Sequence, residues 1–422
     1  MTTDAHRTIA AVWRIESAKL IASLARLVRD VGIAEELAQD ALVAAIEQWP
    51  RSGVPDNPGA WLMAAAKHRA IDRLRRDELA ERKHSELARE LDAGHESATE
   101  AAAEALGDPI GDDLLRLMFT ACHPVLSREA RIALTLRLLG GLTTDEIARA
   151  FLVPEPTIAQ RIVRAKRTLA DAEVPFEVPR GAALAERLAS VLEAIYLIFN
   201  EGYTATAGED WMRPQLCEEA LRLGRILAGL MPAEPEVHGL VALMELQASR
   251  ANARLGPLGE PILLLDQNRA RWDRLLIRRG LAALERARAL GGAHGRYTLQ
   301  AAIAACHARA ATADDTDWAE IAALYRELAG IAPSPVVELN RAVAVGMAFG
   351  PAAGLALADA LVAEPALKSY HLLSTVRADL LEKLGRIDEA RAEYERAAAL
   401  TRNGRERELL LARAARAQTP AR

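Results

Sequence analysis

Four polar side chains between positions 160 and 167 have the types and the spacing to bind a nucleic acid. Gln160, Arg161, Arg164 and Arg167 follow one another at helical intervals, so they share one side of a helix. A guanidinium group neutralises phosphates, and a glutamine amide hydrogen-bonds to base edges. This set therefore predicts a DNA-contacting surface whose later arginines meet phosphates.

The neighbouring residues predict the helix that carries these side chains and a shorter helix before it. Thr143 and Glu146 have the spacing of a capping box, which starts a helix near Thr144. Pro154 and Pro156 suit a helix entry and not a helix interior, so the chain turns at 152–155 and a new helix opens near Thr157. The inward face of that helix is apolar: Ile158, Ile162, Ala165 and Leu169.

Residues 127–169 thus predict a helix-turn-helix, whose second helix can lie in the major groove of DNA. On this segment alone, an ordinary helical hairpin with a solvated basic face is the alternative. The whole chain of 422 residues has a net charge of −5, so its contacts with nucleic acid must come from local patches. Its unaided affinity for DNA should be weak and salt-dependent, which fits a subunit of a larger machine.

Composition predicts an all-α protein without a metal or cofactor. The chain is 51% hydrophobic but only 4% aromatic, and Ala, Leu and Arg are abundant, which favours helices over strands. Cys122, Cys217 and Cys306 are far apart and odd in number, so they indicate neither a disulfide framework nor a metal site. No apolar run approaches the roughly 20 residues that span a bilayer. We therefore expect a soluble cytoplasmic protein that does not contact a membrane.

The chain divides into three helical parts. Residues 8–85 read as helices that are interrupted by a loop at 50–58, and residues 112–171 hold the helix-turn-helix. Between these parts, residues 86–111 are charged, Ala-rich and poor in large apolar side chains, which indicates a linker. Two prolines within 174–180 mark the next boundary, and helical patterns fill residues 180–422.

The C-terminal part carries an approximate repeat. Tyr325 and Pro333 are eight residues apart, as are Leu357 and Pro365, and the two pairs lie 32 residues from one another. Residues 390–397 repeat a small-aromatic-small pattern after the turn at Gly385. This approximates the 34-residue tetratricopeptide (TPR) pattern, in which helical hairpins stack into a superhelix with a concave face.

Residues 10 to about 171 resemble a sigma factor of the extracytoplasmic-function (ECF) group in the sigma-70 family. EELAQDALVAAIEQW (35–49) resembles the region 2 helix that docks on the polymerase β′ clamp. NPGAWLMAAAKHRAIDRLRR (57–76) resembles the region 2 helix that melts and reads the minus 10 element. Residues 127–169 resemble region 4, which binds the minus 35 element and touches the β flap.

The resemblance implies a role for each matching residue. Core polymerase would be bound by Glu36, Leu37, Gln39 and Asp40. DNA at the minus 10 element would be bound by Lys67, His68, Arg69, Arg73, Arg75 and Arg76. DNA at the minus 35 element would be bound by Thr157, Gln160, Arg161, Arg164 and Arg167.

Some of these positions depart from the family or have a plainer interpretation. His68 stands where the family often has Asn, and Ala159 stands where it often has Lys, so the promoter sequence cannot be copied from other members. The acidic residues of 36–40 would otherwise be a solvated helix face. Trp61 and Ile71 have apolar neighbours that favour burial in the core.

Residues 180–422 resemble the long TPR-like extension of one ECF group, for example in YLIFNEGYTAT (196–206) and PSPVVELNRAVAVG (333–346). In that group the extension is thought to regulate the sigma factor in place of a separate anti-sigma factor, which implies contact between the extension and the sigma domains. Polar residues here could form a binding patch, or they could cap helices and link repeats. They are Asn200, Glu201, Tyr203, Asp266, Gln267, Arg271, Trp272, Asp273, Asn340 and Arg341.

The sequence therefore predicts an all-α sigma factor with regions 2 and 4 and an extension that regulates in cis or docks a partner. Its partners would be core RNA polymerase and promoter DNA. An enzyme is not expected, because the chain has no Gly-rich phosphate loop and no metalloprotease motif. A conventional helix-turn-helix regulator with a ligand-binding repeat domain is the alternative, but it leaves residues 35–49 and 57–76 without a role. A repeat scaffold capped by the N-terminal helices is a further alternative.

Overall fold

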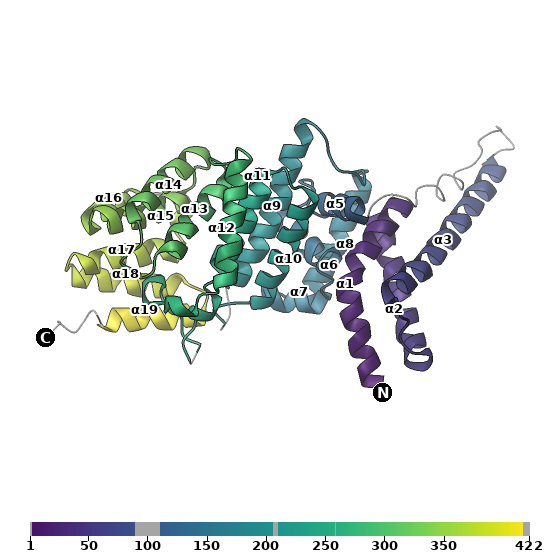
Figure 1. The fold of residues 1–422 in the computed structure, drawn as a ribbon, viewed down its shortest axis with the longest axis horizontal. Coiled ribbons are helices and arrows are strands. Elements are labelled where there is room, and N and C mark those ends of the chain that lie inside the picture. The colour runs from purple at the N-terminus through teal and green to yellow at the C-terminus, as the bar shows by residue number, and fades with distance from the viewer. Residues whose placement is uncertain (1, 89–109, 206–209, 258, 417–422) are drawn as a thin grey trace. The chain divides into compact units, whose positions relative to one another are not determined.

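The computed structural model describes residues 2–88, 110–205, 210–257 and 259–416. These residues form helices joined by turns, with no strand among them, which confirms the predicted all-α class. The chain divides into two compact units, Met1–Ile195 and Tyr196–Arg422 (Figure 1). Residues 89–109, which make up most of the expected linker 86–111, lie outside the described residues.

Three N-terminal helices begin the first unit. Asp30 starts the second of them, because its carboxylate accepts a hydrogen bond from the Ile33 amide at 2.8 Å. The buried Trp49 ring meets Trp61 edge to face, with ring centroids 5.4 Å apart, so Trp61 packs against the core as expected. The three helices are α1 (Thr2–Val28), α2 (Val31–Ser52) and α3 (Pro58–Ala88).

The helix-turn-helix forms as its sequence predicts. Thr143 and Glu146 make both hydrogen bonds of the capping box, and Leu152 ends the capped helix in a left-handed conformation at φ +51°. The next helix opens at Glu155, and its four predicted apolar residues are buried. The domain comprises α5 (Ile110–Ala121), α6 (Arg128–Leu138), α7 (Thr144–Phe151) and α8 (Glu155–Asp171).

Helix α9 (Ala182–Tyr203) crosses the boundary between the two units, and its first half belongs to the first. The Ser190 hydroxyl donates to the Cys122 carbonyl at 2.5 Å, and Arg187 donates to the Phe119 carbonyl at 3.0 Å. Glu193 forms an ion pair with Arg131 of α6 at 3.2 Å. The start of the segment that the sequence assigns to the extension is therefore attached to the helix-turn-helix domain.

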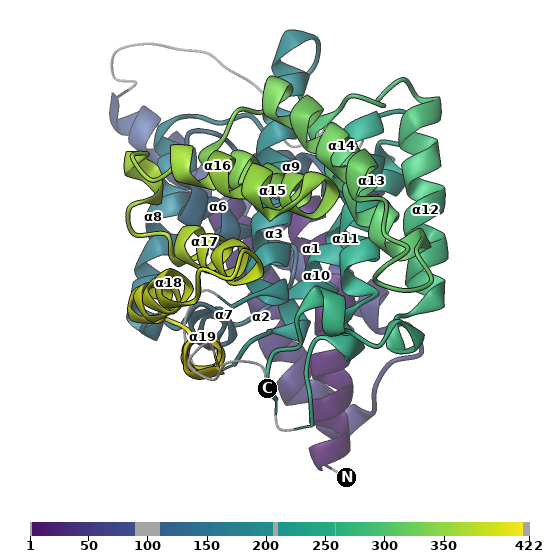
Figure 2. The same cartoon turned by 90° about the vertical axis from the view of Figure 1, so that its left-hand side faces the viewer.

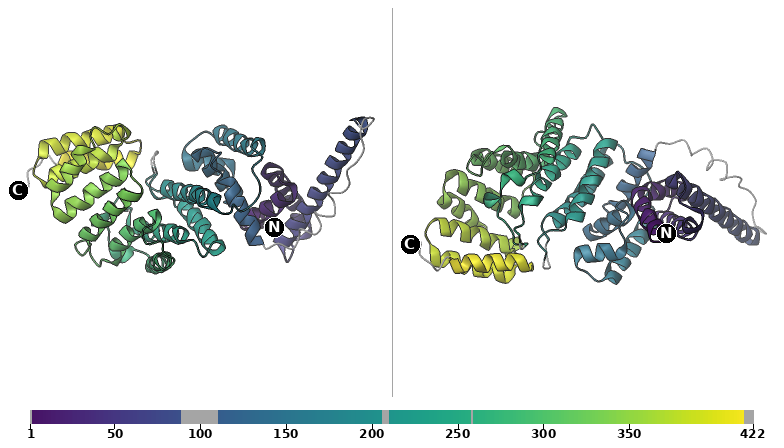
Figure 3. Two further views of the ribbon diagram at one scale, coloured as in Figure 1. Left: turned by 90° about the horizontal axis from the view of Figure 1, so that it is seen from above. Right: turned by 60° about the horizontal axis from the view of Figure 1, so that its bottom comes forward.

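The second unit is a stack of helical hairpins. Each helix from α11 onward packs against the next in sequence, and α11 with α13 and α15 with α17 also pack together (Figures 2 and 3). This next-but-one packing is typical of helical repeats. The helices are α10 (Pro214–Leu230), α11 (Pro235–Ala248), α12 (Arg274–Ala289), α13 (Arg296–Arg309), α14 (Trp318–Ile331), α15 (Pro335–Phe349), α16 (Pro351–Ala360), α17 (His371–Lys383), α18 (Ile387–Leu400) and α19 (Gly404–Arg416).

Small residues set the closest helix contacts of this stack. A Cβ at Gly354 of α16 would lie 2.7 Å from the Cα of Gly346 of α15, so the two backbones meet where neither residue has a side chain. Tyr394 is fully buried, as are Ala390 and Ala397 on either side of it. The small-aromatic-small pattern of the sequence is therefore a core-packing pattern.

A buried imidazole lies in the middle of the stack. The His307 ring meets Trp318 edge to face at 5.2 Å, and the His307 carbonyl accepts a hydrogen bond from Arg269. Burial, together with the positive charges of Arg250 and Arg269, lowers the pKa of His307 to about 3. His307 is therefore neutral in the folded protein at neutral pH.

The depressed pKa of His307 predicts acid sensitivity of the second unit. The unfolded imidazole gains its proton near pH 6.5 and the folded one only near pH 3, so stability falls as the pH drops through this window. The expected loss from this group is up to about 1.4 kcal/mol per pH unit. Urea unfolding followed by tryptophan fluorescence at pH 7.5 and pH 5 measures it. The loss should be smaller in His307→Gln, and an equal loss in both proteins would contradict the assignment.

Candidate polymerase and nucleic-acid interface

The outward face of α8 presents most of the predicted minus 35 residues. Thr157, Gln160 and Arg164 are exposed, and Arg161 is half-buried. Arg167 is exposed and forms an ion pair with Asp171 at 3.4 Å. Because the α7–α8 turn is fixed by its cap and prolines, these side chains are displayed on a rigid element. The arrangement can supply hydrogen-bonding groups near the start of α8 and cations further along it.

Helix α3 presents the predicted minus 10 residues less uniformly. His68, Arg75 and Arg76 are exposed, whereas Lys67, Arg69 and Arg73 are half-buried. Arg73 also forms an ion pair with Glu36 of α2 at 3.5 Å.

One residue of α3 differs from the sequence interpretation. Ile71 is 42% exposed instead of buried, because it lies three residues from His68 and four from Arg75, on the same outward side. An apolar side chain therefore lies among the cations of the outward α3 face.

The four predicted polymerase-binding residues of α2 do not share one face. Glu36 and Asp40 are exposed, but Leu37 is buried, and Gln39 is half-buried and donates to Glu35 at 2.6 Å. Leu37 therefore belongs to the core of the helical domain.

Sequence reasoning missed two residues of the exposed α2 face. Val43 is 51% exposed and Ile46 is 40% exposed. They lie beside Glu36, Asp40 and Glu47, which repeat at helical spacing on the outward side. A sequence analysis could have found them by looking for apolar residues at helical spacing from the acidic residues of the same helix.

A buried ionic seam joins the N-terminal helices to the helix-turn-helix domain. Glu35 of α2 is only 3% exposed, and its carboxylate accepts a hydrogen bond from the Arg137 Nε of α6 at 2.6 Å. Lys166 of α8 forms an ion pair with the other oxygen of the same carboxylate. Both cations therefore belong to the helix-turn-helix domain, whereas the carboxylate belongs to the N-terminal helices.

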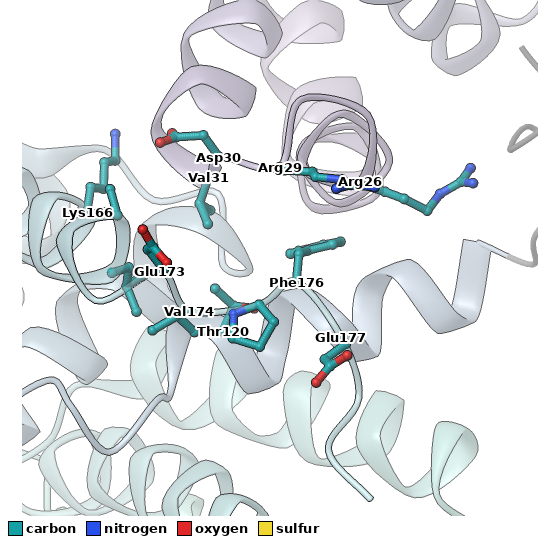
Figure 4. A pocket seen from close by; sticks show the side chains of 13 residues that line it. Arg26, Arg29, Asp30, Val31, Thr120, Lys166, Glu173, Val174, Phe176 and Glu177 are labelled. Carbon is teal, nitrogen blue, oxygen red and sulfur yellow. The ribbon is translucent and has the colours of Figure 1, made fainter. Parts of the chain in front are cut away.

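A second buried carboxylate lies on the helix-turn-helix side of this seam and is paired with a cation of the N-terminal helices. Asp113 of α5 is buried and forms ion pairs with Arg26 of α1 at 3.0 Å and with Arg116 at 2.9 Å. Burial raises the pKa of Asp113, although both arginines act against that shift. A cavity of about 650 Å³ lies beside these residues, and Figure 4 shows Arg26, Lys166 and Phe176 among the side chains around it.

The second unit has a separate cavity of about 400 Å³. Three of the predicted patch residues line it: Asn200 and Tyr203 of α9 and Asn340 of α15. Aromatic and aliphatic side chains share its wall with several polar ones, among them Arg296. A cavity of this mixed lining could bind a ligand that has both polar and apolar parts.

The other predicted patch residues have structural partners or lie elsewhere. Glu201 is buried and ion-paired with Arg213, and Asp273 caps α12 by accepting hydrogen bonds from Leu275 and Leu276 amides. The remaining residues do not line this cavity. Gln267 and Trp272 are buried, Asp266 and Arg271 are exposed, and Arg341 forms an ion pair with Glu338 at 2.7 Å.

Comparison with protein families matches three segments of the chain. Residues 15–79 match sigma-70 region 2, and residues 116–169 match sigma-70 region 4. Residues 187–288 match a family of unknown function (DUF6596). The region 2 match covers α2 and most of α3, which a conventional helix-turn-helix regulator would leave without a role.

Two relatives support the same division. The chain is 44% identical to "Uncharacterized protein R00370" of Rhizobium meliloti (strain 1021) over 396 residues, which cover 91% of this chain and 90% of that protein. It is 24% identical over 174 residues to "Probable ECF RNA polymerase sigma factor SigI" of Mycobacterium tuberculosis (strain ATCC 25618 / H37Rv). That alignment covers 41% of this chain and 58% of the relative.

No solved structure matches the chain. Among the described helices, none combines the length and the apolar character that crossing a membrane requires. The described residues also hold no group of three or more His, Cys, Asp or Glu side chains placed to bind a metal ion.

Proposed function

We propose that this chain, which belongs to the ECF group of the sigma-70 family and is an RNA polymerase sigma factor, binds core enzyme through the exposed face of α2 and binds promoter DNA through α3 and α8. The observation that carries this assignment of surfaces is the separation of charge among exposed residues. Acidic and apolar side chains lie together on α2, whereas cations lie on the outward faces of α3 and α8.

Core enzyme would be bound before DNA. The net charge of −5 leaves the free chain little attraction for phosphates, so promoter binding depends on being held by the polymerase. Promoter opening is then driven by binding energy and needs no catalytic residue in this chain. The sigma-70 region 2 and region 4 families are not enzyme families. The protein would act where RNA polymerase acts, in the cytoplasm.

The β′ clamp would meet Glu36, Asp40, Val43 and Glu47 on the exposed side of α2. This mixture suits a partner surface that combines cations with an apolar patch. Leu37 and Gln39 would act indirectly, because Leu37 packs the helix in place and Gln39 hydrogen-bonds to Glu35. The β flap would contact region 4, where Leu152 is a 53% exposed apolar residue beside the α7–α8 turn.

Charge reversal on the outer face of α2 tests the polymerase contact. Asp40→Arg should weaken binding of the full chain to core polymerase by about tenfold or more. The substitution replaces the proposed attraction between the Asp40 carboxylate and cations of the polymerase with a repulsion between like charges. Glu186→Arg makes the same change at an exposed position of α9 and should bind core normally. Fluorescence titration of labelled sigma factor with core enzyme measures both constants. Unchanged affinity of Asp40→Arg would contradict the proposed site.

Removal of one cation from α8 tests the minus 35 contact. Arg164→Ala should weaken holoenzyme binding to promoter fragments by about 5- to 100-fold and reduce the slope of its salt dependence by about one. Arg149→Ala is the matched control, because Arg149 is an exposed arginine of α7 that forms an ion pair with Asp145 at 2.8 Å. The fragments would be those that wild-type holoenzyme selects from genomic DNA. Equal losses in the two variants would contradict a specific role for Arg164.

The extension would regulate the sigma factor in cis or dock a partner through its 400 Å³ cavity. Asn200 and Asn340 bring amide groups to this cavity from α9 and α15. Such amides can bind the backbone or polar groups of an incoming segment. A contact with the sigma domains of the same chain is the in-cis form of this proposal.

A substitution in the cavity tests the in-cis form. Asn340→Leu in the full chain should change run-off transcript yield at least about twofold without changing core affinity, because it removes only the docking amide. A rise would identify a brake, and a fall would identify a role in assembly. Asn252→Leu alters an exposed amide outside the cavity and should leave transcription unchanged. Wild-type yield from Asn340→Leu would contradict in-cis regulation through this cavity.

A further inference from the structure

We infer that the 400 Å³ cavity of the second unit binds a small organic acid, with its carboxylate at Arg296 and its apolar body against the aromatic wall. This inference rests on the proposed docking role of the cavity, and it adds the chemical class of the ligand. Helices α9, α11, α13, α14 and α15 supply the wall, and all of its residues belong to the second unit.

The wall of this cavity is positively charged although the chain as a whole is negative. Its described residues include Arg296 and no aspartate or glutamate, whereas the whole chain has 58 acidic residues against 53 Lys and Arg. Arg296 is the first residue of α13 and is exposed, and its guanidinium carbon lies 5.5 Å from the centre of the Tyr297 ring. An anion that enters the cavity therefore meets a cation in the wall and no like charge there.

Two further cations lie behind the wall, against the Tyr203 ring that lines the cavity. The guanidinium carbon of Arg254 lies 3.6 Å from the centre of this ring, and that of Arg250 lies 5.7 Å from it. Arg254 is only 7% exposed and donates hydrogen bonds to the Tyr203 carbonyl and the Thr204 hydroxyl. Arg250 donates to the amide oxygen of Gln247, which also lines the cavity. Because these acceptors are neutral, they leave the positive charge of both guanidinium groups in place.

Hydrogen bonds hold the polar groups of the wall in position. The Tyr196 hydroxyl donates to Gln300 Oε1 at 3.0 Å, and Gln300 Nε2 donates to the Arg296 carbonyl at 3.2 Å. These two bonds fix the start of α13 beside the cavity. Burial raises the pKa of Tyr325 to about 12, so its hydroxyl remains a hydrogen-bond donor at neutral pH. A carboxylate, which only accepts hydrogen bonds, matches a wall that offers hydroxyl, amide and guanidinium donors.

The start of α13 favours a carboxylate over a phosphate. Phosphate sites commonly use the free backbone amides of a helix N-terminus. At α13 these amides already donate to the Glu236 carboxylate, from Tyr297 at 2.8 Å and from Thr298 at 3.1 Å. Glu236 also brings a negative charge to the helix start, which disfavours a second negative charge on the ligand. The single guanidinium of the wall therefore matches a singly charged group.

The rest of the wall can hold an apolar body. Phe199 and Tyr203 stack with ring centroids 5.6 Å apart, and Tyr196 meets Tyr297 edge to face at 5.4 Å. Aliphatic side chains complete this surface: Leu243, Ile303, Leu328, Val336 and Val337. The cavity volume of about 400 Å³ lies within the range of small-molecule sites. An aromatic or aliphatic body with one acidic group therefore fits both the size and the lining.

Two dyes that differ by one sulfonate test the charge requirement. 8-Anilinonaphthalene-1-sulfonate (ANS) carries one negative charge, and N-phenyl-1-naphthylamine (NPN) has the same aromatic body without it. In fluorescence titrations of the full chain, Arg296→Gln should weaken ANS binding by about fivefold or more, because a charge-assisted hydrogen bond is lost, and should leave NPN binding unchanged. Arg279→Gln makes the same change at an exposed position of α12 outside the cavity and should leave both constants unchanged.

Competition against ANS identifies the acidic group. 4-Phenylbutyrate should displace ANS from the wild-type chain at about tenfold lower concentration than 4-phenylbutanamide, which lacks the charge, or phenyl phosphate, which carries a further negative charge. Equal ANS affinities of Arg296→Gln and Arg279→Gln, or equal displacement by the acid and the amide, would overturn the inference. Stronger displacement by phenyl phosphate would overturn the choice of a carboxylate. These titrations contain neither polymerase nor DNA, so their failure is distinguishable from a failure of the Asn340→Leu transcription test, which addresses the docking role itself.

Discussion

A carboxylate that leaves water must be matched by charge, and Glu35 meets this requirement with side chains from another region of the chain. Its 3% exposure makes the match necessary, and Arg137 and Lys166 supply it. Breaking a buried ion pair by removing one partner typically costs about 3–5 kcal/mol. This one interaction therefore couples the position of α2, which carries the proposed polymerase surface, to the position of α8, which carries the proposed minus 35 surface.

The local features of the DNA-binding elements follow from their sequence. The Thr143–Glu146 capping box, the prolines before α8 and its buried apolar face all occur as predicted. Each depends on residues within a few positions of one another, so sequence spacing alone determines it. The same holds for the burial of Tyr394 between two alanines in the repeat.

Features that depend on distant residues could not be read in this way. Leu37 is buried because its surroundings come from other helices, which the amphipathic pattern of a single helix does not report. Glu35 looked like one more acidic residue of α2, and nothing near it in sequence points to Arg137 or Lys166. Nor does the proline-rich boundary at 174–180 indicate that the first half of α9 packs on α5 and α6.

The central claim is that the exposed face of α2 binds core polymerase, and site-specific cross-linking tests it most directly. A photoreactive side chain at Val43, which is 51% exposed on the side of α2 that carries Asp40 and Glu47, should cross-link to the β′ subunit when the full chain is mixed with core enzyme. A failure of this position to cross-link to β′ would contradict the account.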